Sequence, residues 1–244
     1  MKKYLFVIGI VFIILVSAFF VGRNSDTQIK PVAQGEKPQQ QTSQVTFDKT
    51  KYSTTKPGSI WWIVNKQRAA GASYAPTDLV VPNVPVRPSA GADERKLRKE
   101  AAGGLEALVA AAKKENINLM LASGYRSYQT QVTVYNNEVK QYGQAKADTQ
   151  SAKPGYSEHQ TGLAMDVEDG ARKCEVSDCF GTLPEGKWVA ANAYKYGFIV
   201  RYTPGKESIT GYRAEPWHIR YICTELSNEM HKQNISTLEE FFSN

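Results

Sequence analysis

Two short stretches of this 244-residue chain constrain its fold more than any other feature. The first reads Ser-Glu-His-Gln-Thr-Gly-Leu-Ala-Met-Asp from Ser157 to Asp166, and the second reads Glu-Pro-Trp-His from Glu215 to His218. Together they contain two histidines, an aspartate and a separate glutamate, which are the side chains that a catalytic zinc site requires. A fold that uses them as one site must bring these two distant stretches side by side.

We interpret His159, Asp166 and His218 as the metal ligands, because three protein ligands leave one position of a catalytic zinc site open for water. Glu215 is then the carboxylate that moves the proton of that water. Taken alone, His159 fits a structural histidine and Asp166 fits a surface acid. Both simple interpretations would have to hold together beside a complete Glu-x-x-His motif, so the metal site is favoured. The chain has only three histidines, and the third, His231, lies in a polar run typical of a helix surface.

The residues around Asp166 predict how it is presented. Positions 163–167 alternate between larger apolar residues and the pair Ala164 and Asp166, which is the pattern of a half-buried strand. Asp166 therefore shares a face with a small neighbour that leaves room for an ion. Gly162, just before the strand, allows a tight turn between the first two ligands.

The second stretch predicts an irregular strand. Pro216 excludes the preceding Glu215 from helical backbone. In a regular strand, however, Glu215 and His218 would point to opposite faces of the sheet. We therefore expect a bend or bulge at Pro216 that turns both side chains inward.

Apolar spacing predicts the elements that surround these motifs. Helices are expected at Asp93–Lys114, Tyr128–Val139, Trp188–Tyr196 and Glu225–Phe242, and short strands at Asn118–Ala122 and Phe198–Tyr202. The proline-containing opening from Trp61 to Pro82 predicts an extended wrap. Arg126 follows the first of these strands, where a guanidinium can bind a carboxylate through two parallel hydrogen bonds. Alone, an arginine in such a place is more often part of a surface ion pair.

The first 56 residues predict an anchor and a tether. Lys2 and Lys3 precede the charge-free segment 4–22, which has the length of a membrane span. Residues 1–3 would be cytoplasmic, 4–22 a transmembrane signal-anchor, 23–56 a disordered linker poor in apolar residues, and 57–244 the catalytic domain. We thus expect a single-pass protein of a bacterial cell membrane with its domain outside the cytoplasm. A cleaved signal peptide is the second possibility.

Charge and cysteine content restrict the partners and the environment. The formal net charge of +6 suits anionic surroundings, but no arginine-rich run or basic stripe with interleaved aromatic residues indicates nucleic acid. Outside the cytoplasm, Cys174 and Cys179 could close a local disulfide, and a second metal site is the alternative. Cys223 lies in an apolar run, which indicates a buried free thiol.

Both stretches, with Ser123-Gly124-Tyr125-Arg126-Ser127 and Gln131, resemble the zinc D-alanyl-D-alanine carboxypeptidases of the VanY and LdcB type. The resemblance runs from about Trp61 to Ile222. It implies an α+β fold with a central antiparallel sheet flanked by helices, as in the LAS group of peptidases and the hedgehog signalling domain. It also implies Zn²⁺ bound by the three ligands and Glu215 as general base and acid. Arg126 would stabilise the oxyanion, while Gln131, Ser157 and Tyr202 would contact substrate.

The substrate implied by this resemblance is the terminal D-alanine of a peptidoglycan stem peptide, and we expect the enzyme to be a monomer. The same motif residues fit an LD-carboxypeptidase that trims tetrapeptide stems. A lytic endopeptidase would need a longer open groove. A non-catalytic module that binds cell-wall peptides has no use for Glu215, which argues against it.

Overall fold

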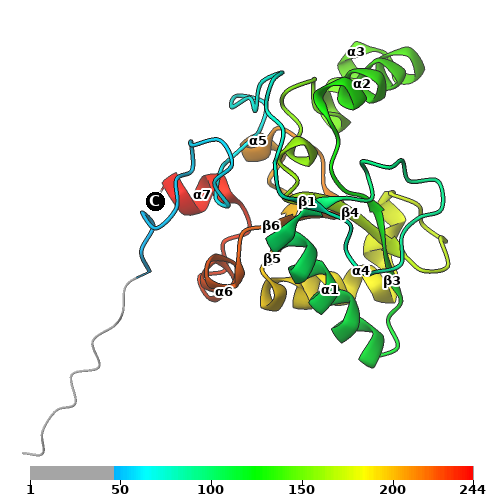
Figure 1. Ribbon diagram of the computed structural model, residues 1–244, viewed down its shortest axis with the longest axis vertical. Coiled ribbons are helices and arrows are strands. Elements are labelled where there is room, and N and C mark those ends of the chain that lie inside the picture. The colour runs from blue at the N-terminus through cyan, green and yellow to red at the C-terminus, as the bar shows by residue number, and fades with distance from the viewer. Residues whose placement is uncertain (1–46, 244) are drawn as a thin grey trace, which may run out of the picture. The chain divides into compact units, whose positions relative to one another are not determined.

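The computed structural model describes residues 47–243 (Figure 1). The expected anchor, 4–22, and the linker as far as residue 46 lie outside the described residues. Within the described range, no helix is both long and apolar enough to span a membrane.

A four-stranded antiparallel sheet forms the centre, with the strand order β3-β4-β6-β5. Its strands are β3 (Leu119–Ser123), β4 (Ala164–Asp169), β5 (Phe198–Tyr202) and β6 (Glu215–Tyr221). A separate antiparallel pair joins β1 (Leu79–Val80) to β2 (Leu97–Arg98). The expected α+β fold with a central antiparallel sheet is thus confirmed.

Helices surround this sheet (Figure 1). The α-helices are α1 (Lys99–Lys114), α2 (Tyr128–Tyr142), α3 (Gln144–Gln150), α4 (Pro184–Asn192), α5 (Glu207–Thr210), α6 (Thr224–Lys232) and α7 (Leu238–Ser243). The 3₁₀ helices are η1 (Glu158–Thr161), η2 (Asp178–Thr182) and η3 (Ala193–Tyr196).

Several helix predictions were wrong in their extent. The helix expected at Trp188–Tyr196 begins earlier, at Pro184, and ends at Asn192, where η3 follows. The helix expected from Asp93 begins only at Lys99, because the carbonyls of Glu94 and Lys96 accept hydrogen bonds from the residues just after β3 and hold this segment in a turn. The single helix expected at 225–242 is divided into α6 and α7. Between them Asn234 has a φ of 54°, which ends the first helix. The Thr237 hydroxyl then caps the second by accepting a hydrogen bond from the Glu240 N–H.

The alternation of side chains along the strands separates the core from the polar face. Met165 and Val167 of β4 and Ile219 of β6 belong to the main apolar cluster, which also contains residues of α1 and α4. Their neighbours Asp166 and His218 point to the other face. This confirms the alternation predicted for 163–167, but both faces of β4 are buried rather than one, and Asp166 and His218 lie opposite the main core.

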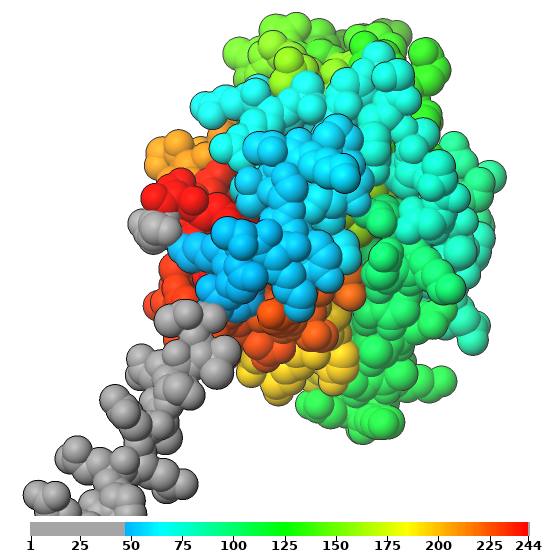
Figure 2. Space-filling view, turned by 60° about the vertical axis from the view of Figure 1, so that its left-hand side comes forward, coloured from blue at the N-terminus to red at the C-terminus, as the bar shows by residue number. Residues whose placement is uncertain are grey.

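A second apolar cluster includes Trp61, Ile222 and Phe241. The Phe47 ring stacks on Trp61 and meets Phe241 edge-on, so residues we expected at the end of the linker pack on the domain. Figure 2 shows this opening segment, in blue, beside the red C-terminal helix.

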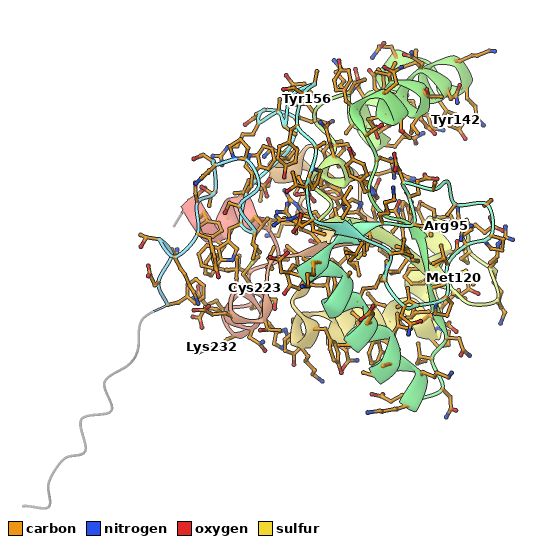
Figure 3. The ribbon with its side chains drawn as sticks, in the orientation of Figure 1. Arg95, Met120, Tyr142, Tyr156, Cys223 and Lys232 are labelled. Carbon is orange, nitrogen blue, oxygen red and sulfur yellow. A yellow bond between two sulfur atoms is a disulfide. The ribbon has the colours of Figure 1, made fainter. Side chains whose placement is uncertain are left out.

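The cysteines divide into a pair and a single thiol. Cys174 and Cys179 form a disulfide, which decides between the two interpretations of these residues. Cys223 is free, next to the start of α6 (Figure 3), and it is only partly buried rather than fully buried as expected.

Candidate active site

The fold brings the three expected metal ligands together. His159 comes from η1, Asp166 from β4 and His218 from β6, and their ligand atoms all lie within 4.8 Å of one another. The Asp166 carboxylate is central, with one oxygen 3.4 Å from His159 Nε2 and the other 3.2 Å from His218 Nδ1. All three side chains are buried. Two imidazoles and a carboxylate at these separations are a donor set that fits a divalent ion such as zinc.

Local backbone geometry sets the orientation of His159. Its Nδ1 lies 2.7 Å from the Gly124 carbonyl oxygen, which can only accept, so Nδ1 carries the proton and Nε2 keeps its lone pair. Gly124 is required there, because a Cβ would lie 2.4 Å from the Lys96 carbonyl oxygen. Burial and the nearby Arg126 both lower the pKa of His159, which keeps the ring neutral. Gly162 has a φ of 67°, as the predicted tight turn requires.

A register shift brings Glu215 and His218 to one site. Val200 pairs with Ile219, yet two residues further along β5 Tyr202 pairs with Glu215, so β6 carries extra residues around Pro216. The predicted irregularity is therefore present. It leaves Glu215 Oε2 at 3.9 Å from His218 Nδ1. Burial raises the pKa of Glu215 to about 7, which suits a group that accepts and returns a proton near neutral pH.

Arg126 lies directly against the ligand set. Its Nη2 donates to His159 Nε2 at 2.9 Å and to Asp166 Oδ2 at 3.2 Å. Its Nη1 donates to Gln131 Oε1 at 3.1 Å, and its Nε donates to Ser123 Oγ at 3.2 Å. The guanidinium is thus fixed from both sides, with positive charge held at the site.

The three expected substrate contacts line the same cavity, which has a volume of about 340 Å³. Gln131 uses both ends of its amide within the protein, since Nε2 donates to the Ala152 carbonyl at 2.7 Å. It therefore acts on the site through Arg126. Ser157 is buried just before η1. The Tyr202 ring lies 4.9 Å from that of His218, and burial raises its pKa well above the usual value, which keeps its phenol protonated.

Comparison with known proteins shows where this arrangement occurs. Residues 94–224 match the family model VanY, D-alanyl-D-alanine carboxypeptidase. The chain belongs to the VanY family. It is 47% identical over 186 residues to the putative carboxypeptidase YodJ of Bacillus subtilis (strain 168), an alignment that covers 76% of this chain and 68% of the relative.

Solved structures of this family agree in fold. The LdcB LD-carboxypeptidase is 46% identical with a TM-score of 0.72, covering 77% of this chain and 87% of the other. A mutant of the D,D-pentapeptidase VanY, solved in complex with Zn(II), is 30% identical with a TM-score of 0.60, covering 74% and 97%. The chain is thus a carboxypeptidase-family hydrolase, and its relatives include both DD and LD enzymes.

One buried carboxylate beside the candidate ligands of this VanY-family chain was not recognised from the sequence. Glu158 is fully buried; its Oε1 accepts hydrogen bonds from Arg201 Nε at 2.8 Å and Arg220 Nη1 at 2.9 Å. Its Oε2 lies 3.5 Å from Nε2 of His218, on the side of the ring away from Asp166. A carboxylate behind a histidine ligand orients the ring and strengthens it as a ligand.

The charges around Glu158 also act on His218. Burial opposes ionisation of both groups, but the two arginines hold the pKa of Glu158 well below its usual range. Contacts with Asp166 and Glu158 raise the pKa of His218 to about 9 despite its burial. A signal was present in the sequence: Arg201 and Arg220 each interrupt an apolar strand, which indicates a buried acidic partner.

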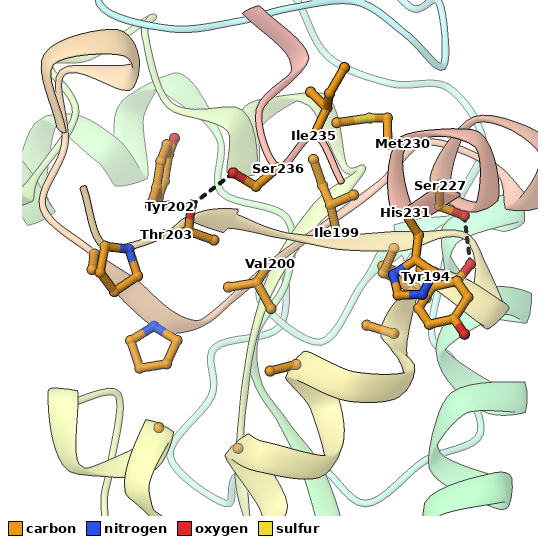
Figure 4. A pocket seen from close by; sticks show the side chains of 18 of the residues that line it. Tyr194, Ile199, Val200, Tyr202, Thr203, Ser227, Met230, His231, Ile235 and Ser236 are labelled. Atoms are coloured by element: carbon orange, nitrogen blue, oxygen red, sulfur yellow. Dashed lines mark hydrogen bonds between the residues drawn. The ribbon is translucent and has the colours of Figure 1, made fainter. Parts of the chain in front are cut away.

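A larger cavity, of about 620 Å³, runs along the edge strand β5 and is separate from the metal-ligand triad (Figure 4). Ile199, Val200, Met230 and Ile235 contribute to its lining, and a stacked pair, Tyr194 and His231, lies at one end. None of the three expected ligands lines it, so the candidate active site is the smaller cavity.

Proposed function

We propose that this chain is a zinc-dependent D-alanyl-D-alanine carboxypeptidase that removes the terminal D-alanine from peptidoglycan stem peptides. The observation that carries the proposal is the buried His-Asp-His triad with Glu215 beside it and Arg126 against it. The family model and the zinc complex of the related VanY support it.

His159, Asp166 and His218 would hold the ion. When bound there, zinc would supply a Lewis acid that polarises the scissile carbonyl and lowers the pKa of water towards about 7. Glu215 takes the proton of the attacking water and delivers it to the leaving amine. Arg126, fixed by Gln131 and Ser123, places positive charge where the oxyanion develops. Ser157 and Tyr202 contribute polar groups on the substrate side of the cavity.

A second candidate is LD-carboxypeptidase activity, which trims a tetrapeptide stem to a tripeptide. It is favoured by the LdcB structure, which exceeds VanY in both identity and TM-score. The proposed ligands and base are the same for both reactions, so they do not separate them.

We further propose that the domain works outside the cytoplasm, as a monomer attached to a bacterial membrane through residues 4–22. The disulfide supports this location, because such bonds persist mainly in oxidising compartments.

The test is mass spectrometry of purified stem pentapeptide and tetrapeptide after incubation with the zinc-loaded protein. Loss of one D-alanine from the pentapeptide alone is expected for a DD-carboxypeptidase. Loss from the tetrapeptide assigns the enzyme to the LD class. If zinc is bound and neither peptide shortens, the carboxypeptidase proposal is wrong, and an endopeptidase or a binding module takes its place.

A further inference from the structure

The loop closed by Cys174 and Cys179 reaches into the candidate active site. Val176, inside this loop, lines the same cavity as the metal-ligand triad, together with Arg87 and Trp217. It also packs against the main apolar cluster. None of the roles assigned so far to ligands, base or arginine explains why an apolar side chain is presented there.

The backbone of Val176 is strained. Its φ is 41°, in the left-handed region that a β-branched residue very rarely adopts. Strain of this kind persists only where the surroundings fix the backbone, and it gathers at sites where a side chain must be held in place. Here the disulfide spans the residue from Cys174 to Cys179.

The loop is anchored on the strand that carries Asp166. At the end of β4, the Asp169 carboxylate accepts hydrogen bonds from the backbone N–H groups of Ala171, Lys173 and Cys174, each at 3.1 Å. Asp169 is buried, so these bonds are shielded from water. The entrance of the loop is therefore as firmly placed as the strand itself.

The C-terminal end of the loop contacts the segment that carries Glu215. Asp178 accepts a hydrogen bond from Arg213 Nη1 at 3.1 Å. In η2, a Cβ placed on Gly181 would lie 3.1 Å from Pro216 Cβ, so Gly181 packs closely on the ring of Pro216. The loop thus joins the two strands, β4 and β6, on one side of the cavity.

We propose that the disulfide-closed loop 174–179 is the specificity wall of the active site, with Val176 as the residue that limits the width of the substrate cavity. The inference deepens the proposed function, on which it rests for the class of substrate. Val176 restricts the residue that lies against it to the size of alanine, and the disulfide keeps it in place.

Val176→Gly separates this role from a purely structural one. Glycine adopts a positive φ without strain, which offsets part of the packing and chain entropy that the variant loses, so the variant should remain folded, as a thermal unfolding curve shows. At the same time the cavity loses its apolar wall. Peptides whose terminal or penultimate D-alanine is replaced by D-leucine should gain about tenfold in kcat/KM relative to the D-alanine peptides. If the loop has only a structural role, the ratio of kcat/KM values for the D-leucine and D-alanine peptides should not change.

The disulfide is tested with Cys174→Ala/Cys179→Ala, and Cys223→Ala is the matched control. The double variant should relax the preference in the same direction as Val176→Gly while it keeps its zinc, and the control should match the wild type. Unchanged selectivity in both Val176→Gly and the double variant overturns the proposal.

Failure of the proposed function is recognised separately, in the wild type. If the wild type cleaves none of the peptides, the same D-alanine and D-leucine peptides are titrated calorimetrically into the zinc-loaded proteins. A wild-type preference for D-alanine that Val176→Gly loses supports the wall. Equal preferences in the two proteins contradict it.

Discussion

The two sides of the active site are held by ion pairs of opposite character. On one side, the side chains of Glu158, Arg201 and Arg220 are all 0% exposed. On the other, Arg213 and Asp178 are 42% and 73% exposed. Breaking a buried pair leaves a charge without compensation in the interior, whereas an exposed pair is screened by water and contributes little. The buried side is therefore positioned by its charges, whereas on the exposed side the ion pair contributes little, and the hydrogen bonds to Asp169 and the disulfide hold the loop.

The buried side extends well beyond the cavity. Arg201 also donates two hydrogen bonds to Glu239 of α7, and Arg220 donates to the carbonyls of Ile60 and Trp62. One carboxylate behind a histidine ligand is thus connected to the opening wrap and to the last helix.

The largest effect on turnover is expected for substitution of Glu215, which lies between the two sides of the active site. Glu215→Ala should lower kcat by about 10²–10⁴-fold, because it removes the group that accepts and returns the proton. Its zinc content should stay at the wild-type level, as measured by metal analysis. The exposed Glu207→Ala serves as the matched control and should leave turnover unchanged. Full activity of Glu215→Ala would show that another group is the base.

The Glu158→Ala variant removes the buried ion pairs with Arg201 and Arg220. This variant leaves Arg201 and Arg220 facing each other without the carboxylate between them, so the free energy of unfolding should fall by about 3–5 kcal/mol. Urea denaturation followed by tryptophan fluorescence measures the change. A loss below 1 kcal/mol would mean that the two sides do not differ in the way described.

A smaller change at the same position, Glu158→Gln, tests how the buried charge behind His218 affects zinc binding. The amide keeps the size of the side chain but removes the negative charge behind His218. Zinc affinity should fall by about 10–100-fold, measured by competition with a chromophoric chelator. Glu239→Gln, which alters the same network away from His218, is the control and should retain more of the affinity.

The smallest effect is expected on the exposed side. Asp178→Ala removes the ion pair with Arg213 and should change the free energy of unfolding by less than about 1 kcal/mol. The measurement is the same denaturation experiment, repeated at high salt, where the difference from the wild type should shrink further. A loss as large as that of Glu158→Ala would contradict the contrast.

The sequence predicted that His159, Asp166, Glu215 and His218 meet at one site, and it predicted the strand patterns, because each of the two motifs and each alternation depends on residues close together in the chain. Asp166 was placed by the alternation around it, and the bulge by the conflict between regular strand alternation and the need for Glu215 and His218 to face the same side. Glu158, in η1, was missed because its partners Arg201 and Arg220 lie far away in the sequence, on β5 and β6. The division of the last helix was missed because Asn234 and Thr237 interrupt a segment whose apolar spacing continues on both sides. The choice between a disulfide and a metal at Cys174 and Cys179 likewise needed three-dimensional information.

The link from His218 through Glu158 and Arg201 to Glu239 has a consequence for biosynthesis. While the chain is being made, His159, Asp166 and His218 are all complete before Glu239 has been added. At that stage Arg201 lacks one of its two acidic partners, and α7 is not yet docked. The final charge balance behind the histidine is therefore reached only once α7 has docked and Glu239 has met Arg201.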